Sequence, residues 1–266
     1  MIDLTITDGI AEVVLNAPSR MNALNEEALA ELQTAYDDAT AAASRGEVRA
    51  LLLRGEGRGF CAGRDISGVT PADDDVMGYL GDKVTPLLQS MSAFPAPTFA
   101  AVQGACLGVG LGLALATDVV YVAANAKIGS PFANLGATLD SGGHWLFTER
   151  LGTHRTLDLI YTAELISGAE AVASGLFSRS MPAETLLEDT RAIVAKVATG
   201  ATGAFMASKE LVAQIRDERL GLWASMANEN RAQADLCGTE DYAEGFAAFQ
   251  QKRRPEFHGW SPSGTK

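Results

Sequence analysis

Two glycine-rich segments, each directly after a short apolar run, constrain the fold of this 266-residue chain more than any other feature. Residues 59–63 follow the largely apolar run 50–54, and residues 104–112 follow the apolar run 98–102. Continuous runs of this kind are typical of strands that are buried on both faces of a sheet. Glycine allows a sharp turn and a close approach of another group to the backbone. The pattern therefore predicts two strand–turn–helix units of an α/β fold.

The first half of the chain alternates between strand and helix signals. Asp8-Gly9 separates two short segments of alternating apolar and polar residues, which is the signal of a two-residue hairpin. Apolar residues at helical spacing predict helices, and continuous apolar runs predict strands. The helices are expected over residues 25–43, 76–91 and 107–117, and the later strands over 50–54, 98–102 and 119–123.

The second half is mostly helical in pattern, with one short strand expected over residues 177–179. The helices are expected over residues 155–162, 169–174, 186–198, 205–236 and 241–252. This change in pattern divides the chain into an α/β core, residues 1–195, and a C-terminal helical region, residues 196–266.

The charge balance excludes several kinds of partner. The chain has 33 acidic and 21 basic residues, a formal net charge of −12, so it lacks the basic surface that attracts nucleic acids and anionic membranes. Its longest apolar stretch, residues 98–124, is interrupted by polar residues and glycines, which argues against a transmembrane span. Residues 1–5 do not resemble a signal peptide. We expect a cytoplasmic protein with no nucleic-acid or membrane partner.

Metal binding finds little support in the sequence. Cys61, Cys106 and Cys237 are widely separated and form no CxxC pair, so neither a disulfide framework nor a zinc site is predicted. The run Asp73-Asp74-Asp75 lacks the alternating ligands and the glycine turn of a calcium loop, and we interpret it as a solvated loop. No metal site is therefore expected.

The glycine segments suggest a site for an anion. The start of a helix presents unpaired N–H groups and the positive end of its dipole, which suit a phosphate or a developing oxyanion. A dinucleotide fingerprint does not fit, because Leu113 stands where the third glycine belongs. Instead, N–H groups from two separate turns, one of them at Arg64, could converge on one carbonyl oxygen as an oxyanion hole. Taken alone, the first segment is also compatible with an ordinary strand-to-helix turn.

In combination, these segments resemble the crotonase (enoyl-CoA hydratase/isomerase) superfamily, and their order and spacing match it across nearly the whole chain. The segments that carry the resemblance are residues 20–24 (RMNAL), 60–65 (FCAGRD), 101–110 (AVQGACLGVG), Asp118, 143–152 and 246–253 (FAAFQQKR). The resemblance implies a spiral of ββα units that binds acyl-CoA, residues 1–195. It also implies a C-terminal helical region, residues 196–266, that assembles a homotrimer or a dimer of trimers.

The resemblance also implies individual site residues. The N–H groups of Arg64 and Val109 would bind the thioester oxygen of an acyl-CoA. The residues implied to hold the substrate and its CoA part are Arg20, Ala62, Asp65, Ile66, Gly108 and Lys252, the last from a neighbouring subunit. A solvated helix end is the alternative interpretation of Arg20 and Lys252. No cofactor is implied other than the coenzyme A of the substrate.

The acids of the chain narrow the expected reaction. Hydratases of this superfamily carry two catalytic glutamates, and the matching positions here hold Gly112 and Phe132. Addition of water needs a paired base and acid, so their absence puts ordinary hydration in doubt. Asp140 remains, in a D-x-G-G-x-W pattern through Trp145 that looks closest to phenylacetate-pathway enoyl-CoA isomerases. A 1,3-proton shift needs one base, and Asp140 is the expected catalytic residue.

Asp140 has a second interpretation, since aspartate is also a favoured helix N-cap. If it is the base, burial by apolar neighbours would raise its pKa toward working pH. The expected neighbours are Phe132, Leu135, Leu139 and Trp145. We therefore expect an enoyl-CoA isomerase that works through an oxyanion-stabilised thioester enolate. The alternatives are an enoyl-CoA hydratase of fatty-acid or aromatic-acid degradation, and a non-catalytic acyl-CoA binder.

Overall fold

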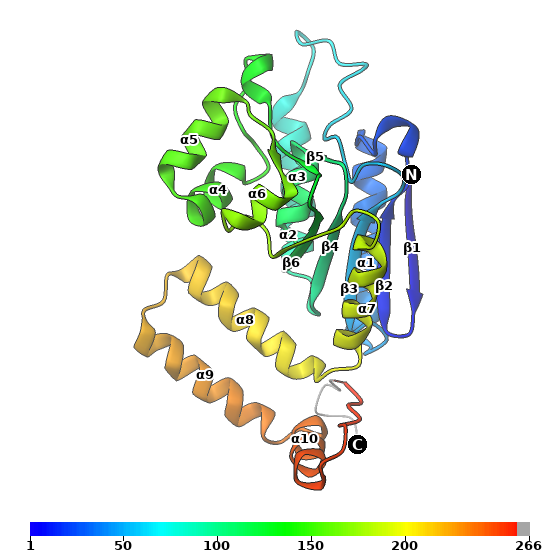
Figure 1. Ribbon diagram of the computed structural model, residues 1–266, viewed down its shortest axis with the longest axis vertical. Coiled ribbons are helices and arrows are strands. Elements are labelled where there is room, and N and C mark those ends of the chain that lie inside the picture. Colours follow the sequence, from blue (N-terminus) through cyan, green and yellow to red (C-terminus); the bar gives the residue numbers. More distant parts are fainter. Residues whose placement is uncertain (260–266) are drawn as a thin grey trace.

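A six-stranded sheet forms the centre of the structure, a computed structural model that describes residues 1–259 (Figure 1). The strand order is β1-β2-β3-β4-β6-β9; the first pair is antiparallel and the others are parallel. The strands are β1 Ile2–Thr7, β2 Ile10–Leu15, β3 Ala50–Gly55, β4 Thr98–Val102, β6 Val119–Ala123 and β9 Arg179–Met181. The hairpin at Asp8-Gly9 is confirmed, whereas the strand expected over 177–179 lies two residues further on. The end of the expected helical region, residues 260–266, lies outside the described part of the chain.

A smaller sheet carries the second glycine segment. It has the order β5-β7-β8, with β5 Ala105–Leu107 parallel to β7 Lys127–Gly129, and β7 antiparallel to β8 Ile166–Ser167. The helix expected over residues 107–117 is shorter, because β5 continues to Leu107 and α3, Val109–Leu115, begins only after Gly108. Gly108 has φ 52° and ψ −124°, a conformation that favours glycine. The chain thus makes two strands, β4 and β5, before α3, and likewise β1 and β2 before the first long helix, α1 Glu26–Ser44; this order is the ββα unit.

Helices lie between the strands in the sequence and make up most of the second half of the chain. In addition to α3, they are α1 Glu26–Ser44, α2 Thr85–Ser92, α4 Gly143–Leu151, α5 Thr153–Thr162, α6 Gly168–Ala173, α7 Leu186–Ala198, α8 Thr202–Glu218, α9 Leu222–Leu236 and α10 Glu240–Gln251. Helix α1 packs against β1, and α7 packs across β3, β4 and β6. The expected helix over 76–91 is divided into a π-helical segment, η2 Gly78–Val84, and α2. Two 3₁₀ turns, η1 Pro18–Arg20 and η3 Phe132–Leu135, complete the described elements that position the site.

The start of α1 shows how local sequence sets these boundaries. The side chain of Asn25 caps the helix by accepting a hydrogen bond from the N–H of Ala28 at 2.9 Å. Leu32 and Tyr36, one turn apart, are fully buried in the core. Helix α1 therefore has both a favoured N-cap and a continuous apolar face.

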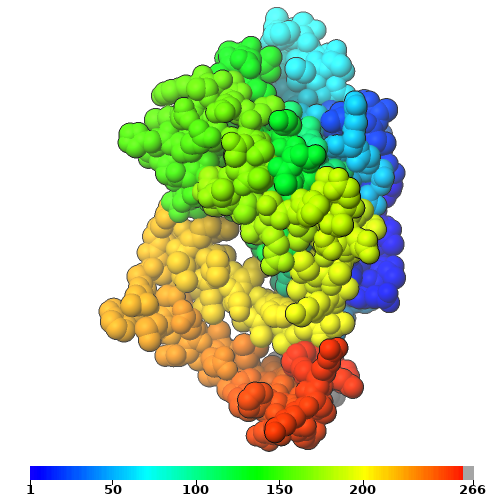
Figure 2. Space-filling view, viewed as in Figure 1, coloured from blue at the N-terminus to red at the C-terminus, as the bar shows by residue number. Residues whose placement is uncertain are grey.

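Helices α8 and α9 form a hairpin that extends away from the sheets, with α10 at its base (Figure 1). The single helix expected over residues 205–236 is wrong, because the chain turns at Arg219 in a left-handed conformation with φ 55°. Figure 2 shows a hollow between the yellow α8 and the green chain above it. The large apolar side chains exposed on α8, α9 and α10 are Phe205, Val212, Ile215, Leu222, Trp223, Met226, Phe246 and Phe249. No helix within residues 1–259 is long and apolar enough to cross a membrane.

Candidate active site

The two glycine turns lie against each other. Cys61 and Cys106 form a parallel β-bridge that joins the segments just before the turns. A Cβ atom at Gly63 would lie 2.9 Å from the carbonyl oxygen of Leu107 and 3.8 Å from Cα of Gly108. Gly63 and Gly108 also have positive φ angles, 97° and 52°. A side chain at Gly63 would push the two turns apart, so the glycines are what bring the following residues together.

Each of these glycines is followed by a free backbone N–H group. In the part of the chain that the structure describes, the N–H groups of Arg64 and Val109 donate no hydrogen bond. The neighbouring N–H groups of Asp65 and Gly108, in contrast, donate to carbonyl oxygens at 2.9 and 3.2 Å. Two unpaired donors in adjacent turns can bind one oxygen anion. The structure therefore brings together the two N–H groups that the resemblance implied.

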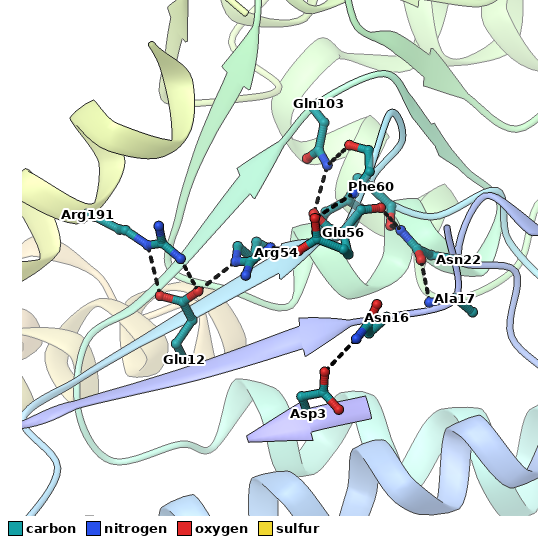
Figure 3. Close-up of polar contacts among 12 residues, drawn as sticks. Asp3, Glu12, Asn16, Ala17, Asn22, Arg54, Glu56, Phe60, Gln103 and Arg191 are labelled. Atoms are coloured by element: carbon teal, nitrogen blue, oxygen red, sulfur yellow. Dashed lines mark hydrogen bonds and ion pairs between the residues drawn. The ribbon is translucent and has the colours of Figure 1, made fainter. Parts of the chain in front are cut away.

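Two amide side chains hold the first turn in place (Figure 3). The Nδ2 atom of Asn22, a residue only 2% exposed, lies 2.8 and 3.1 Å from the carbonyl oxygens of Gly59 and Phe60. The Nε2 atom of Gln103 lies 2.8 Å from the carbonyl oxygen of Gly55 and 3.3 Å from that of Gly59. Neither Asn22 nor Gln103 was predicted to support the site. In the sequence, Gln103 could have been noticed, because it is an amide residue between the apolar segments of β4 and β5.

An ion-pair cluster fixes the strands that lead into this turn (Figure 3). Glu12 on β2 accepts hydrogen bonds from Arg54 on β3 at 2.6 Å and from Arg191 on α7 at 2.5 and 3.0 Å. Burial alone would raise the pKa of Glu12, but the hydrogen bonds from Arg191 and Arg54 outweigh it and lower this pKa. The cluster therefore joins β2, β3 and α7 with Glu12 ionised.

Asp140 lies half-buried between η3 and α4. It is not an N-cap, because α4 begins at Gly143 with Gly142 in the cap position and no side-chain cap bond. The hydroxyl of Ser141 donates a hydrogen bond to Oδ1 of Asp140 at 2.7 Å. Burial raises the pKa of Asp140, against the opposing effects of Ser141, Arg64 and His144. A carboxyl whose pKa is raised is better suited to take up and return a proton than an exposed one.

The apolar surroundings of Asp140 differ in part from those expected. Leu139 is buried, 6% exposed, and Phe132 packs against the core. Leu135 and Trp145 are instead 65% and 41% exposed. Of the four expected apolar neighbours, only Leu139 and Phe132 are therefore packed into the interior.

The two positions that hold glutamates in the superfamily's hydratases are filled differently here. A Cβ atom at Gly112 would lie 2.6 Å from Cβ of Ser141 and 3.2 Å from its carbonyl oxygen. A Cβ atom at Gly108 would lie 3.1 Å from Cζ of Phe132, so the Phe132 ring covers the second glycine turn. Ser141 itself has a left-handed φ of 54°. The turn at Ser141 thus occupies the space that a side chain at position 112 would need.

A cavity of about 480 Å³ begins beside this turn. It is bounded by η2 and α2 on one side, by α3 and α4 on another, and by the end of α8. Its lining residues are Leu80, Val84, Thr85, Leu88, Gln89, Ser92, Gly112, Leu115, Ala116, Ser141, Gly142, Trp145, Leu146, Arg216 and Asp217. Because Gly112 and Ser141 line it, the cavity is next to Asp140 and can take a group that this carboxylate would act on.

The side chain of Arg64 is held by two partners, Asp74 and Tyr79. Its guanidinium donates hydrogen bonds of 2.8 and 2.6 Å to the carboxylate of Asp74 and lies 4.0 Å from the ring centroid of Tyr79 on η2. The hydrogen bonds that Arg64 donates to the Asp74 carboxylate raise the pKa of Arg64. The solvated loop predicted for Asp73-Asp74-Asp75 is therefore wrong for Asp74, whose side chain is 15% exposed. Spacing alone could not show that this acid meets a residue ten positions earlier.

The residues expected to hold the CoA part lie in two places. Arg20 donates a hydrogen bond of 3.2 Å to Asp65, next to the Arg64 turn. Ala62 is half-buried and Ile66 is 54% exposed, so both reach the surface beside this turn. Lys252 lies at the C-terminal end of α10, far from these residues in the same chain (Figure 1). A role for Lys252 in CoA binding would require a second subunit.

Comparisons with known proteins agree with this geometry. Residues 5–260 match the family model described as enoyl-CoA hydratase/isomerase. A probable enoyl-CoA hydratase of Rhodobacter capsulatus is 36% identical, and the match covers 96% of both chains. A 1,2-epoxyphenylacetyl-CoA isomerase of Escherichia coli is 31% identical over 96% of this chain and 97% of its own. The crystal structure of a putative enoyl-CoA hydratase/isomerase from Mycobacterium abscessus superposes with a TM-score of 0.90 and 28% identity, covering 98% and 100% of the two chains.

The repeated ββα units and the paired turns define a crotonase-fold protein. The chain belongs to the enoyl-CoA hydratase/isomerase family. The resemblance noted from the sequence motifs is thereby confirmed, as is the α/β crotonase-like fold class.

Proposed function

We propose that this chain is an enoyl-CoA isomerase that shifts a double bond in an acyl-CoA thioester with Asp140 as its single carboxylate base. The observation that carries the proposal is the close approach of Gly112 and Ser141. A Cβ atom at position 112 would lie 2.6 Å from Cβ of Ser141, so a second carboxylate has no room there. Asp140, next to Ser141, keeps a half-buried carboxyl whose pKa is raised by burial.

The proposed reaction is a 1,3-proton shift. The Asp140 carboxylate removes a proton from the α carbon of a 3-enoyl thioester, or from the γ carbon of a 2-enoyl thioester in the reverse direction, and the electron pair moves to the thioester oxygen. The free N–H groups of Arg64 and Val109 stabilise the negative charge on that oxygen in the dienolate. Asp140 then returns the same proton to the other end of the dienolate, so that no atom is gained or lost.

The assembly of the active enzyme is part of the proposal. Arg20 and Asp65 flank the Arg64 turn and are proposed, with Ala62 and Ile66, to hold the CoA part of the substrate. The exposed apolar residues of α8, α9 and α10 are proposed to pack between subunits in a homotrimer or a dimer of trimers, since exposed apolar groups in this number mark interaction surfaces. A neighbouring Lys252 would then be available to the CoA phosphates.

Hydration is the second candidate function, because the Rhodobacter capsulatus relative is named as a probable enoyl-CoA hydratase. A non-catalytic acyl-CoA binder is the third, motivated by the missing glutamates at Gly112 and Phe132. The three functions differ in what happens to the substrate. An isomerase changes the position of the double bond without changing the mass, a hydratase adds the mass of one water, and a binder changes nothing.

The test is therefore product analysis. The purified full chain is incubated with matched 2-enoyl- and 3-enoyl-CoA esters, and the products are identified by mass spectrometry and NMR. We expect interconversion of the two esters at constant mass. Accumulation of the 3-hydroxyacyl ester from the 2-enoyl ester would show a hydratase. Tight binding in calorimetry without any product would show a non-catalytic binder.

A further inference from the structure

The cavity beside Asp140 does not end in an apolar wall. It runs beside α3 from Gly112 to Ala116, away from the N–H groups at the start of that helix. Beyond Ala116 it meets Arg216 and Asp217 at the end of α8, and Gln89 and Ser92 at the end of α2. The part of an acyl group that is furthest from the thioester would therefore meet charged and amide side chains rather than aliphatic ones.

The cations near this far end differ in whether a carboxylate pairs with them. Of the cations in this region only Arg216 lines the cavity. Arg150 and Lys209 lie close enough to Arg216 for its charge to lower their pKa values, and Arg219 follows the end of α8. Three acids accompany them: Asp118 pairs with Lys209, Asp217 with Arg216, and Glu149 with Arg219. Arg150 is thus the one of these four cations that has no carboxylate partner within residues 1–259.

Arg150 is the unpaired cation of this group. It is half-buried, and Nη1 donates a hydrogen bond of 3.0 Å to the carbonyl oxygen of Leu176. Within residues 1–259 it has no carboxylate partner. Burial and the neighbouring Arg216 lower the pKa of Arg150, which shows that the two guanidinium groups act on each other. Cations that repel one another at a partly buried site are stabilised by an added negative charge.

Arg216 is the cation that lines the cavity itself. Its Nε and Nη2 atoms donate hydrogen bonds of 2.7 and 2.8 Å to the carboxylate of Asp217. Nη1 donates no hydrogen bond within the described residues, so its N–H groups remain for another acceptor. Arg216 can thus keep Asp217 and bind a second carboxylate.

We propose that the cavity accepts an acyl group that ends in a carboxylate, with Arg216 as the residue that recognises it. The substrate class is then an ω-carboxy acyl-CoA, a thioester of a dicarboxylic acid, rather than a plain fatty acyl-CoA. The inference rests on the proposed function in one respect, that the acyl part of the substrate enters the cavity beside Asp140. A plain alkyl chain would remove water from Arg216, Asp217 and Gln89 without replacing the lost hydrogen bonds, which is unfavourable.

Binding of two saturated esters tests the proposal without any turnover. Adipoyl-CoA and hexanoyl-CoA have six-carbon chains that differ in a terminal carboxylate, and neither has a double bond to move. Calorimetry on the full chain is expected to show adipoyl-CoA binding more tightly by about tenfold, the size of one charge-assisted hydrogen bond at a partly exposed site. This preference should fall as the salt concentration rises, because Arg216 is partly accessible to solvent.

Substitutions test whether Arg216 is the residue that binds the terminal carboxylate. In Arg216→Gln the ratio of the two affinities is expected to fall to about one, whereas Asp217→Asn should increase it because a competing carboxylate is removed. Lys196→Gln removes one positive charge from the exposed face of α7 and is the matched control; it should leave the ratio unchanged. Unfolding curves and light scattering on each variant exclude changes in fold or assembly as the cause.

The outcomes separate this inference from the proposed function. Equal affinities for the two esters in the unmodified chain, or a preference that survives Arg216→Gln, would overturn the carboxylate site. Either result would leave isomerase activity on plain enoyl-CoA esters untouched. An oligomer in which Arg150 and Arg216 are covered by an acid of a second subunit would also appear as equal affinities, and would equally contradict the proposal.

Discussion

Gly112 and Ser141 face each other so closely that a Cβ atom added to Gly112 would lie 2.6 Å from Cβ of Ser141. Real Cβ atoms do not approach another carbon to this distance, and Ser141 cannot withdraw easily because its φ is already left-handed at 54°. The contact joins α3, which begins with the proposed oxyanion donor, to the turn that carries Asp140. This contact explains why position 112 holds glycine instead of glutamate. It also places Asp140, the neighbour of Ser141, close to α3.

Gly112→Ala tests this contact. The added methyl group must displace the Ser141 turn, and overpacking of this kind destabilises a core by about 1–3 kcal/mol. We expect a lower free energy of unfolding in denaturant and a larger loss of isomerase activity than of acyl-CoA binding, since Asp140 moves with Ser141. Gly68→Ala is the control, because a Cβ atom at Gly68 meets nothing within 4 Å. Equal stability of the two variants would show that the turn is not fixed.

Ser141→Ala should change the pH dependence. Burial raises the pKa of Asp140, and the Ser141 hydroxyl opposes this by stabilising the carboxylate. A general base works only when ionised, so the rate falls as pH decreases through its pKa. Removing the hydroxyl should therefore move the acid limb of the kcat/KM profile to higher pH. Ser44→Ala, on the exposed end of α1, should leave the profile in place; a shift in both variants would point to a general effect.

The same pKa has a consequence for stability. Because the pKa of Asp140 is raised on folding, the folded state binds this proton more tightly than the unfolded state. The contribution of Asp140 to stability is therefore most favourable at pH below its unfolded pKa and decreases as pH rises through the folded pKa. Asp140→Asn should remove this decrease, so the variant should gain stability relative to the unmodified chain above that window. Urea unfolding at several pH values measures this difference. A lower free energy of unfolding for Asp140→Asn than for the unmodified chain above that window would contradict the stated burial.

Asp74→Asn tests the pairing of Arg64. In the structure, Asp74 holds the guanidinium with two hydrogen bonds and partly neutralises its charge. Without that carboxylate, Arg64 should lower the pKa of Asp140 further, and the acid limb of the rate profile should move to lower pH. Asp73→Asn changes the adjacent, exposed acid in the same way and is not expected to move it. Identical pH–rate profiles for the two variants would contradict an effect of Asp74 on the pKa of Asp140 through Arg64.

Asn22→Ala should destabilise the turn that precedes Arg64. Nδ2 of Asn22 donates hydrogen bonds to the carbonyl oxygens of Gly59 and Phe60. Its removal leaves these buried acceptors without a donor, which lowers the free energy of unfolding by about 1–3 kcal/mol. We expect lower stability and weaker acyl-CoA binding together. Asn134→Ala, an exposed asparagine on η3, is the comparison. If both variants unfold at the same denaturant concentration as the unmodified chain, the amide is not needed for the turn.

Much of the fold was predictable because its signals are local. The Asp8-Gly9 hairpin and the buried strands at 50–54, 98–102 and 119–123 lie where the apolar patterns place them. The errors arise where backbone geometry overrides propensity. Gly108 delays the start of α3, and a left-handed Arg219 divides the expected helix 205–236 in two. Neither conformation has a signal in hydrophobic periodicity.

The candidate site was predictable in its parts but not in its connections. The glycines before Arg64 and Val109 indicated two turns with free N–H groups, and the structure brings them together. The pairing of Arg64 with Asp74 and the support from Asn22 join residues that are distant along the chain, so spacing could not reveal them. The charge on the far wall of the cavity depends likewise on the folding of α8 against α4.

Hydrogen exchange at the acyl chain tests the central claim most directly. Asp140→Asn is compared with Asp38→Asn, the same chemical change at an exposed position on α1, using an enoyl-CoA ester in deuterated water. The unmodified chain and the Asp38 variant are expected to incorporate deuterium at the α and γ carbons. Asp140→Asn should bind the ester with unchanged affinity and incorporate none. Deuterium incorporation at the full rate in Asp140→Asn would contradict the assignment of Asp140 as the base.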